Sequence, residues 1–338
     1  MKPIELPTLA PAPEPNLSAA DLSRLQHEVR ALAEERNAVI LAHNYQVPEV
    51  QDVAHFVGDS LGLSRRAADT DSDVIAFCGV HFMAETASIL SPDKTVLLPD
   101  LGAGCSLADS ITADELRSWK AQHPGAIVVM YVNTTAEVKA ETDYCCTSSN
   151  AVQVVEHIRR EHGDDVEILF GPDMWLGAYV ERVTGWRMHV WDGECHVHAG
   201  IRPRDISAVR AEHPDAEFMI HPECGCTTQV MEFVASGDLD PQRTHMLSTG
   251  GMLDFARGSD ADTFIVATET GMLHPLAKEN PGKAFVPANR AAAYRYMKMI
   301  TLPKLRDTLR DLSPQVRVDP RLAERARVPI ERMVAINA

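Results

Sequence analysis

One pattern occurs three times in this chain, and it limits the possible folds more than any other feature. A short apolar run ends in polar or aromatic residues at His43, Tyr131 and His221, at intervals of 88 and 90 residues. Each run is bounded by polar residues and followed by loops and helical patterns, which is typical of a buried parallel strand. A repeated unit of this length predicts three similar α/β domains.

The spacing inside the repeats supports this interpretation. Cys105 precedes Tyr131 by 26 residues, and Cys195 precedes His221 by the same number. In each repeat the first apolar run is followed by further apolar runs, mostly separated by helical patterns. This alternation predicts a parallel sheet covered by helices in each repeat. We therefore expect an α/β fold with three homologous parallel-sheet α/β/α domains around a pseudo-threefold axis and one central active site. The alternative is a single large doubly wound sheet in which the repeated sequence pattern is coincidental.

The repeat also sets the expected domain boundaries. We expect a flexible N-terminal arm, three α/β repeats and a C-terminal helical extension, which correspond to residues 1–16, 17–107, 108–197, 198–312 and 313–338. The arm carries five prolines and has no apolar run like that of a signal peptide. No segment approaches the ~20 apolar residues of a membrane span. We therefore expect a cytoplasmic protein that does not bind a membrane.

The net charge limits the classes of molecule that the protein is expected to bind. The chain has 32 Lys and Arg residues against 48 Asp and Glu residues, a net charge of −16. Proteins bind nucleic acids through basic surface patches that neutralise the phosphates, so we expect no nucleic-acid partner for this acidic chain. An anionic small molecule remains compatible, but it would need local positive potential from helix N-termini or from a metal.

Unusual polar residues follow the predicted strands. In parallel sheets the ligand site lies beyond the carboxyl ends of the strands, so three such ends around one axis would share a pocket. Taken singly, each of these residues can be an ordinary polar strand end or a helix cap. Together, hydroxyl groups at several helix N-termini would form an anion-binding cradle. The candidates are His43, Tyr45, Ser60, Tyr131, Asn133, Ser148, His221, Glu223 and Thr249.

The cysteines suggest metal chemistry. There are seven, an odd number, and in a cytosolic chain this favours metal or catalytic use over disulfides. Any single cysteine can also be a small buried apolar residue. Cys105 and Cys195 occupy equivalent places in their repeats, each within two residues of a glycine. Thiolates that converge from separate loops suit an iron–sulfur cluster or zinc.

Several motifs together resemble one known family. In order along the chain they are His43-Asn-Tyr-Gln46, Gly58-Asp-Ser60, Phe77-Cys-Gly-Val-His-Phe-Met-Ala-Glu-Thr86, Gly104-Cys-Ser106, Tyr131-Val-Asn133, Thr147-Ser-Ser-Asn150, Gly171-Pro-Asp173, Cys195-His-Val-His198, His221-Pro-Glu-Cys224 and Ser248-Thr249. These motifs, between about residue 38 and about residue 310, resemble those of quinolinate synthase. The resemblance covers most of the chain.

The resemblance implies a transferase of NAD biosynthesis. Enzymes of this family condense iminoaspartate with dihydroxyacetone phosphate to quinolinate, with loss of phosphate and two waters. A [4Fe-4S] cluster, held by one cysteine from each unit, leaves one iron open as a Lewis acid. The implied partners are the two substrates and, transiently, the oxidase that produces iminoaspartate.

The resemblance assigns the family's cluster ligands and substrate contacts to particular residues of this chain. Cys105 and Cys195 correspond to two cluster ligands, and the matched substrate contacts are His43, Ser60, Tyr131, Asn133, Ser148, His221, Glu223 and Thr249. Among the available acids and bases we assign Glu223 as a base, Tyr45 as a proton relay and His221 as a further catalytic group.

The third cluster ligand departs from the family pattern. The register of the repeats places it at residue 294, which is a tyrosine, and no cysteine follows Cys226. Three interpretations are open: Tyr294 marks a catalytically impaired or cluster-less form, its phenolate binds iron, or Cys224 or Cys226 replaces it. We favour the first interpretation, because thiolate is the softer ligand. Two rival functions are another cluster-dependent dehydratase or reductase and a binding protein that has lost catalysis.

Overall fold

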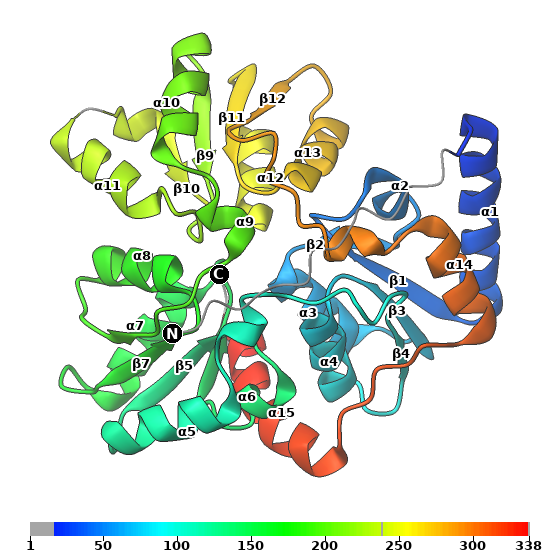
Figure 1. Cartoon of the computed structure of the whole chain (residues 1–338), viewed down its shortest axis with the longest axis horizontal. Coiled ribbons are helices and arrows are strands. Elements are labelled where there is room, and N and C mark those ends of the chain that lie inside the picture. Colours follow the sequence, from blue (N-terminus) through cyan, green and yellow to red (C-terminus); the bar gives the residue numbers. More distant parts are fainter. Residues whose placement is uncertain (1–16, 238, 337–338) are drawn as a thin grey trace.

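The three predicted repeats form three separate sheets. The computed structural model describes residues 17–237 and 239–336. Within these residues there are three four-stranded sheets, whose neighbouring strands are all parallel. They lie around a common centre, with helices both between the sheets and at the periphery (Figure 1). The predicted α/β class is confirmed, and the alternative of one large sheet is wrong. The predicted N-terminal arm, residues 1–16, lies outside the described residues.

Each sheet has the same strand order. Counted within a repeat, the order is second, first, third, fourth. The strands are β1 (Ala38–His43), β2 (Phe56–Gly58), β3 (Val74–Cys78) and β4 (Thr95–Leu97); β5 (Ile127–Tyr131), β6 (Tyr144–Cys146), β7 (Ile168–Gly171) and β8 (His189–Val190); and β9 (Glu217–Ile220), β10 (Thr244–Met246), β11 (Thr263–Ala267) and β12 (Ala284–Pro287). Strands β1 and β3 are buried along their whole length, which explains their continuous apolar sequences.

Helices separate most of the strands. They are α1 (Ala19–Glu35), α2 (Pro48–Gln51), α3 (Ser60–Asp69), α4 (His81–Leu90), α5 (Ala113–Gln122), α6 (Ala136–Lys139), α7 (Ala151–His162), α8 (Met174–Thr184), α9 (His196–Ala199), α10 (Pro203–Glu212), α11 (Thr227–Ser236), α12 (Thr249–Gly258), α13 (Leu273–Glu279), α14 (Leu302–Asp311) and α15 (Pro320–Ala335). Short 3₁₀ turns cover Ala108–Ser110, Pro241–Arg243, Thr270–Met272 and Met297–Met299.

The last two helices tie the repeats together. Helix α5 leads from the first sheet into the second, and α10 leads from the second into the third. Their counterpart after the third sheet, α14, packs against α1 and β3 of the first repeat and so closes the ring (Figure 1). Helix α15 then packs against α4, α6 and β6, between the first and second repeats. The carboxyl ends of the three sheets are thereby fixed around one central cavity.

Candidate active site

The central cavity collects side chains from all three repeats. Its lining includes the residues that the sequence assigned to substrate binding, catalysis or metal binding, but not the alternative ligands Cys224 and Cys226: they are His43, Tyr45, Ser60, Cys105, Tyr131, Asn133, Ser148, Cys195, His221, Glu223 and Thr249. Tyr294 lines the same cavity. The structure therefore brings the proposed residues together, while their individual roles stay predictions.

Two strand-end histidines are built alike. His43 ends β1 and His221 directly follows β9. The Nδ1 atom of His43 accepts the Tyr45 backbone N–H at 3.2 Å, and Nδ1 of His221 accepts the Glu223 backbone N–H at 3.4 Å. Burial lowers the pKa of His43 to about 3 and that of His221 to about 4. Both rings are therefore neutral at pH 7, with the proton on Nε2.

The second repeat places a tyrosine at the equivalent strand end. The Tyr131 hydroxyl donates a hydrogen bond to Oε1 of Glu223, a buried carboxylate of the third repeat. Burial and the Glu223 charge raise the pKa of Tyr131 well above its usual value. Burial opposes ionisation of Glu223, but the nearby His221 and His198 rings and the Tyr131 hydroxyl together keep its pKa below the usual range. Glu223 is thus an ionised carboxylate beside protonated hydroxyls.

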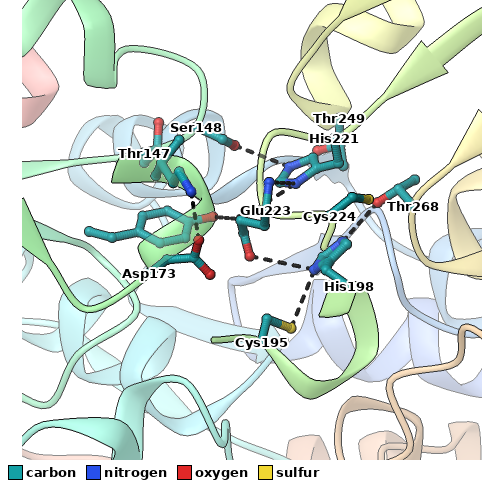
Figure 2. A network of polar contacts seen from close by, with 12 residues as sticks. Thr147, Ser148, Asp173, Cys195, His198, His221, Glu223, Cys224, Thr249 and Thr268 are labelled. Atoms are coloured by element: carbon teal, nitrogen blue, oxygen red, sulfur yellow. Dashed lines mark hydrogen bonds and ion pairs between the residues drawn. The ribbon is translucent and has the colours of Figure 1, made fainter. Parts of the chain in front are cut away.

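A second network surrounds His198, which was not assigned a role from the sequence. Its Nε2 atom lies 3.2 Å from the Tyr45 hydroxyl and 3.0 Å from Oγ1 of Thr268. Its Nδ1 atom lies 3.3 Å from Sγ of Cys195 and 3.5 Å from Oε2 of Glu223 (Figure 2). The short Cys195-x-x-His198 spacing, one turn of α9, was the only local signal of this arrangement. Its other partners come from distant parts of the chain.

Asp173 is another buried acid that was not assigned a role. Its side chain is fully buried at the start of α8, where Oδ1 accepts the Leu176 backbone N–H at 2.7 Å. Burial and the negative charge of Glu223 raise its pKa well above the usual value. The two carboxyl groups are therefore shifted in opposite directions, with the pKa of Asp173 raised and that of Glu223 lowered. Such a separation is common where acid and base roles are divided.

Hydroxyl groups line the side of the cavity next to the helix starts. Ser60 and Thr249 are the first residues of α3 and α12, and Ser148 lies in the turn before α7. Ser148 Oγ is 3.2 Å from Nε2 of His221, and the Asn44 side-chain amide donates to Thr249 Oγ1 at 3.0 Å. Together with the helix N-termini, these groups can donate hydrogen bonds to an anion.

Two thiols reach the cavity. Cys105 and Cys195 line it, whereas Cys224 and Cys226 are buried outside its lining. The Cys224 thiol donates to the Ala267 carbonyl at 3.0 Å. Tyr294 is buried, and its hydroxyl lies beside the Cys105 thiol. Burial, followed by the nearby thiols, raises the pKa of Tyr294 well above its usual value, so the phenol is protonated at neutral pH.

The fold and the cavity define a class of protein. It is a three-repeat parallel α/β protein whose central site combines thiols, neutral histidines, hydroxyl groups and a buried carboxylate. The helices of the described residues include none that is long and apolar enough to cross a bilayer.

Comparison with known proteins identifies the family. Residues 27–335 match the family model described as Quinolinate synthetase A protein. The quinolinate synthase of Mycobacterium sp. strain KMS is 58% identical over 311 residues, which cover 92% of this chain and 91% of the relative. The quinolinate synthase of Mycobacterium tuberculosis strain H37Ra is 56% identical, with 92% and 88% covered. The chain belongs to the quinolinate synthase family.

Proposed function

We propose that the cavity condenses iminoaspartate with dihydroxyacetone phosphate to quinolinate, with release of phosphate and two waters. The observation that carries this proposal is the convergence of the strand-end residues of all three repeats on one buried cavity. Family membership supplies the reaction, and the side chains of the cavity supply groups that suit its substrates.

The hydroxyl groups and neutral histidines bind the anionic groups of the substrates. Ser60, Ser148 and Thr249 donate hydrogen bonds to carboxylate or phosphate oxygens beside the helix N-termini. The amide oxygen of Asn133 lines the cavity and has no hydrogen-bond partner among the described residues. It accepts a hydrogen bond from the imine or a hydroxyl group of the substrate, since a buried acceptor without a partner is costly.

Proton transfer falls to Glu223 and Tyr45. Glu223 is ionised and accepts a proton, while Tyr131 holds its second oxygen in place. The Tyr45 hydroxyl lies 2.6 Å from Thr268 Oγ1 and 3.2 Å from His198 Nε2, so it stays protonated and can pass a proton to a leaving hydroxyl. The buried cavity excludes water, which protects the imine from hydrolysis.

The cluster that the family implies does not fit the residues of this chain. A [4Fe-4S] cluster is held by thiolates, and here Cys105 and Cys195 face a protonated Tyr294 at the third position. Cys224 and Cys226, the two alternative donors, do not line the cavity. We therefore assign no step to the cluster, and we propose that the chain is an impaired quinolinate synthase because of Tyr294.

Activity and cluster content test this proposal. The chain and its Tyr294→Cys variant are reconstituted anaerobically with iron and sulfide, and quinolinate is measured with iminoaspartate generated in situ. We expect a four-iron cluster and clear quinolinate formation in the variant, and little of either in the original chain. No quinolinate from a cluster-loaded variant would refute the reaction. A full cluster and high activity in the original chain would refute the impairment.

A further inference from the structure

Three different metal-binding groups meet in the wall of the cavity. One donor atom each of Cys195, His198 and Glu223 lies within 4.8 Å of the other two, and all three side chains are buried (Figure 2). We propose that they form a binding site for a single divalent ion, Zn²⁺ or Fe²⁺, which uses the Cys195 thiolate that the cluster of the family would use and so is an alternative to that cluster. The site needs no donor at residue 294.

Two of the three distances between donor atoms match those of a coordination shell. Cys195 Sγ lies 3.3 Å from His198 Nδ1, and Nδ1 lies 3.5 Å from Glu223 Oε2. Zinc bond lengths of about 2.0–2.3 Å at tetrahedral angles place neighbouring donor atoms roughly 3.4–3.6 Å apart. The Nδ1–Oε2 distance is long for a hydrogen bond but agrees with this value. The third distance, from Cys195 Sγ to the Glu223 carboxylate oxygen, is at most 4.8 Å, so one ion can bind all three groups once these two side chains draw together.

The surrounding groups orient the donors in the way that metal sites require. His198 Nε2 lies 3.0 Å from Thr268 Oγ1 and 3.2 Å from the Tyr45 hydroxyl, so it can donate its proton there. The lone pair is then on Nδ1, the atom that faces Cys195 and Glu223. Tyr131 binds Oε1 of Glu223 and leaves Oε2 for the metal, so an ion bound here takes Glu223 out of its proposed role as base. Hydrogen bonds of this kind fix the tautomer and orientation of metal ligands.

The charge of the cavity also favours a cation. None of the described residues that line it is a lysine or arginine, while Asp59 and Glu223 are both acidic. The proposed substrates are anions, and the side chains offer them hydrogen bonds but no positive charge, which a bound ion would add. Three protein ligands would leave a fourth position open towards the cavity, as in catalytic zinc sites. This Lewis-acid role rests on the proposed function, whereas metal binding itself does not.

A second group of potential metal ligands lies at the protein surface, and the experiment below can distinguish it from the cavity site. His123, Glu167 and His189 meet at the surface, with Glu167 Oε2 3.5 Å from His123 Nδ1 and 3.4 Å from His189 Nε2. The His123 and His189 rings lie only 4.0 Å apart, so an ion would have to separate them. This surface group contains no sulfur, so a metal–thiolate absorption band cannot come from it.

Cobalt provides the test, because a Co²⁺–thiolate bond absorbs in the near ultraviolet. The full chain is treated with a chelator, kept anaerobic and titrated with Co²⁺, and Zn²⁺ is then added as competitor. We expect one thiolate-bound Co²⁺ per chain, displaced by Zn²⁺. Cys195→Ser should abolish the band, and His198→Asn should weaken binding by more than 100-fold. Thr268→Val, which removes the Oγ1 contacts with His198 and Tyr45 but no metal ligand, should weaken it by about 10–100-fold.

Two controls make the outcome specific. Cys78→Ser changes a buried cysteine of β3 outside the cavity lining and should leave Co²⁺ binding unchanged. Near-ultraviolet circular dichroism confirms that each variant is folded. A chain without a thiolate band, or a band that survives His198→Asn but not Cys105→Ser, overturns the proposal, because the second result indicates a two-thiolate site. Quinolinate formation by Tyr294→Cys is measured separately, so the proposed function can stand or fall independently.

Discussion

Acidification should destabilise the metal-free protein through its two strand-end histidines. Burial lowers the pKa of His43 to about 3 and of His221 to about 4, against a usual value of 6.5. Below pH 6.5 the unfolded chain binds protons that the folded chain does not, so the free energy of unfolding falls with the pH. The loss continues until the pH reaches the folded pKa of each ring.

The size of the effect follows from the same values. Each unit of pH below the unfolded pKa costs about 1.4 kcal/mol per histidine, so lowering the pH from 8 to 5 costs roughly 2 kcal/mol for each ring. The two rings together contribute about 4 kcal/mol, a large part of the 5–15 kcal/mol typical of a folded domain. The Nδ1 contacts with backbone N–H groups give the structural reason, since a protonated ring cannot accept them.

Urea unfolding followed by circular dichroism tests this, in the presence of a chelator at pH 8, 7, 6 and 5. His43→Gln and His221→Gln should each remove about half of the pH dependence, whatever they do to the absolute stability. His162→Gln, at an exposed position, should leave the dependence unchanged. A free energy of unfolding that stays constant between pH 8 and pH 5, or a dependence unaffected by both buried variants, would show that the rings are not held neutral.

Three further outcomes are expected. Ser148→Ala should weaken quinolinate binding, measured by calorimetry, by about 1.5–3 kcal/mol, because the variant loses a hydrogen bond from the hydroxyl group to a charged ligand. An unchanged affinity would show that Ser148 does not bind the anion. Tyr294→Cys should raise bound iron and sulfide after anaerobic reconstitution towards four each, and an unchanged count would mean that another feature prevents cluster assembly. Quinolinate should raise the Co²⁺ affinity of the original chain by about 5–150-fold, and Co²⁺ should raise quinolinate affinity by the same factor; independent binding would contradict the metal as counter-charge.

The sequence predicts the sheets and the shared cavity because both depend on local signals. Buried parallel strands leave continuous apolar runs, and the equal spacing from Cys105 to Tyr131 and from Cys195 to His221 indicates equivalent strand ends. Strand β2 escaped prediction because it spans only Phe56–Gly58 and is only partly buried.

Long-range contacts explain the rest of what the sequence did not reveal. The pattern after Ile300 predicts a helix, but it does not specify that α14 packs on the first sheet and closes the ring. His198 depends on Tyr45 and Thr268, which lie 153 and 70 positions away in the chain. Glu269 is fully buried and accepts the Tyr294 backbone N–H at 3.0 Å, yet no motif marks it.

The protonation states of the side chains in the cavity explain why binding of a metal ion and binding of an anionic substrate should favour each other. Burial keeps His43 and His221 neutral and keeps the Tyr294 hydroxyl and the Cys195 thiol protonated, since each charged form would be poorly solvated there. The side chains therefore offer hydrogen bonds to an anion but little positive charge. A divalent ion at Cys195, His198 and Glu223 would supply that charge, and an anionic substrate would in turn offset the burial of the ion. Each ligand thus lowers the electrostatic cost of the other, which is the physical basis of the expected coupling.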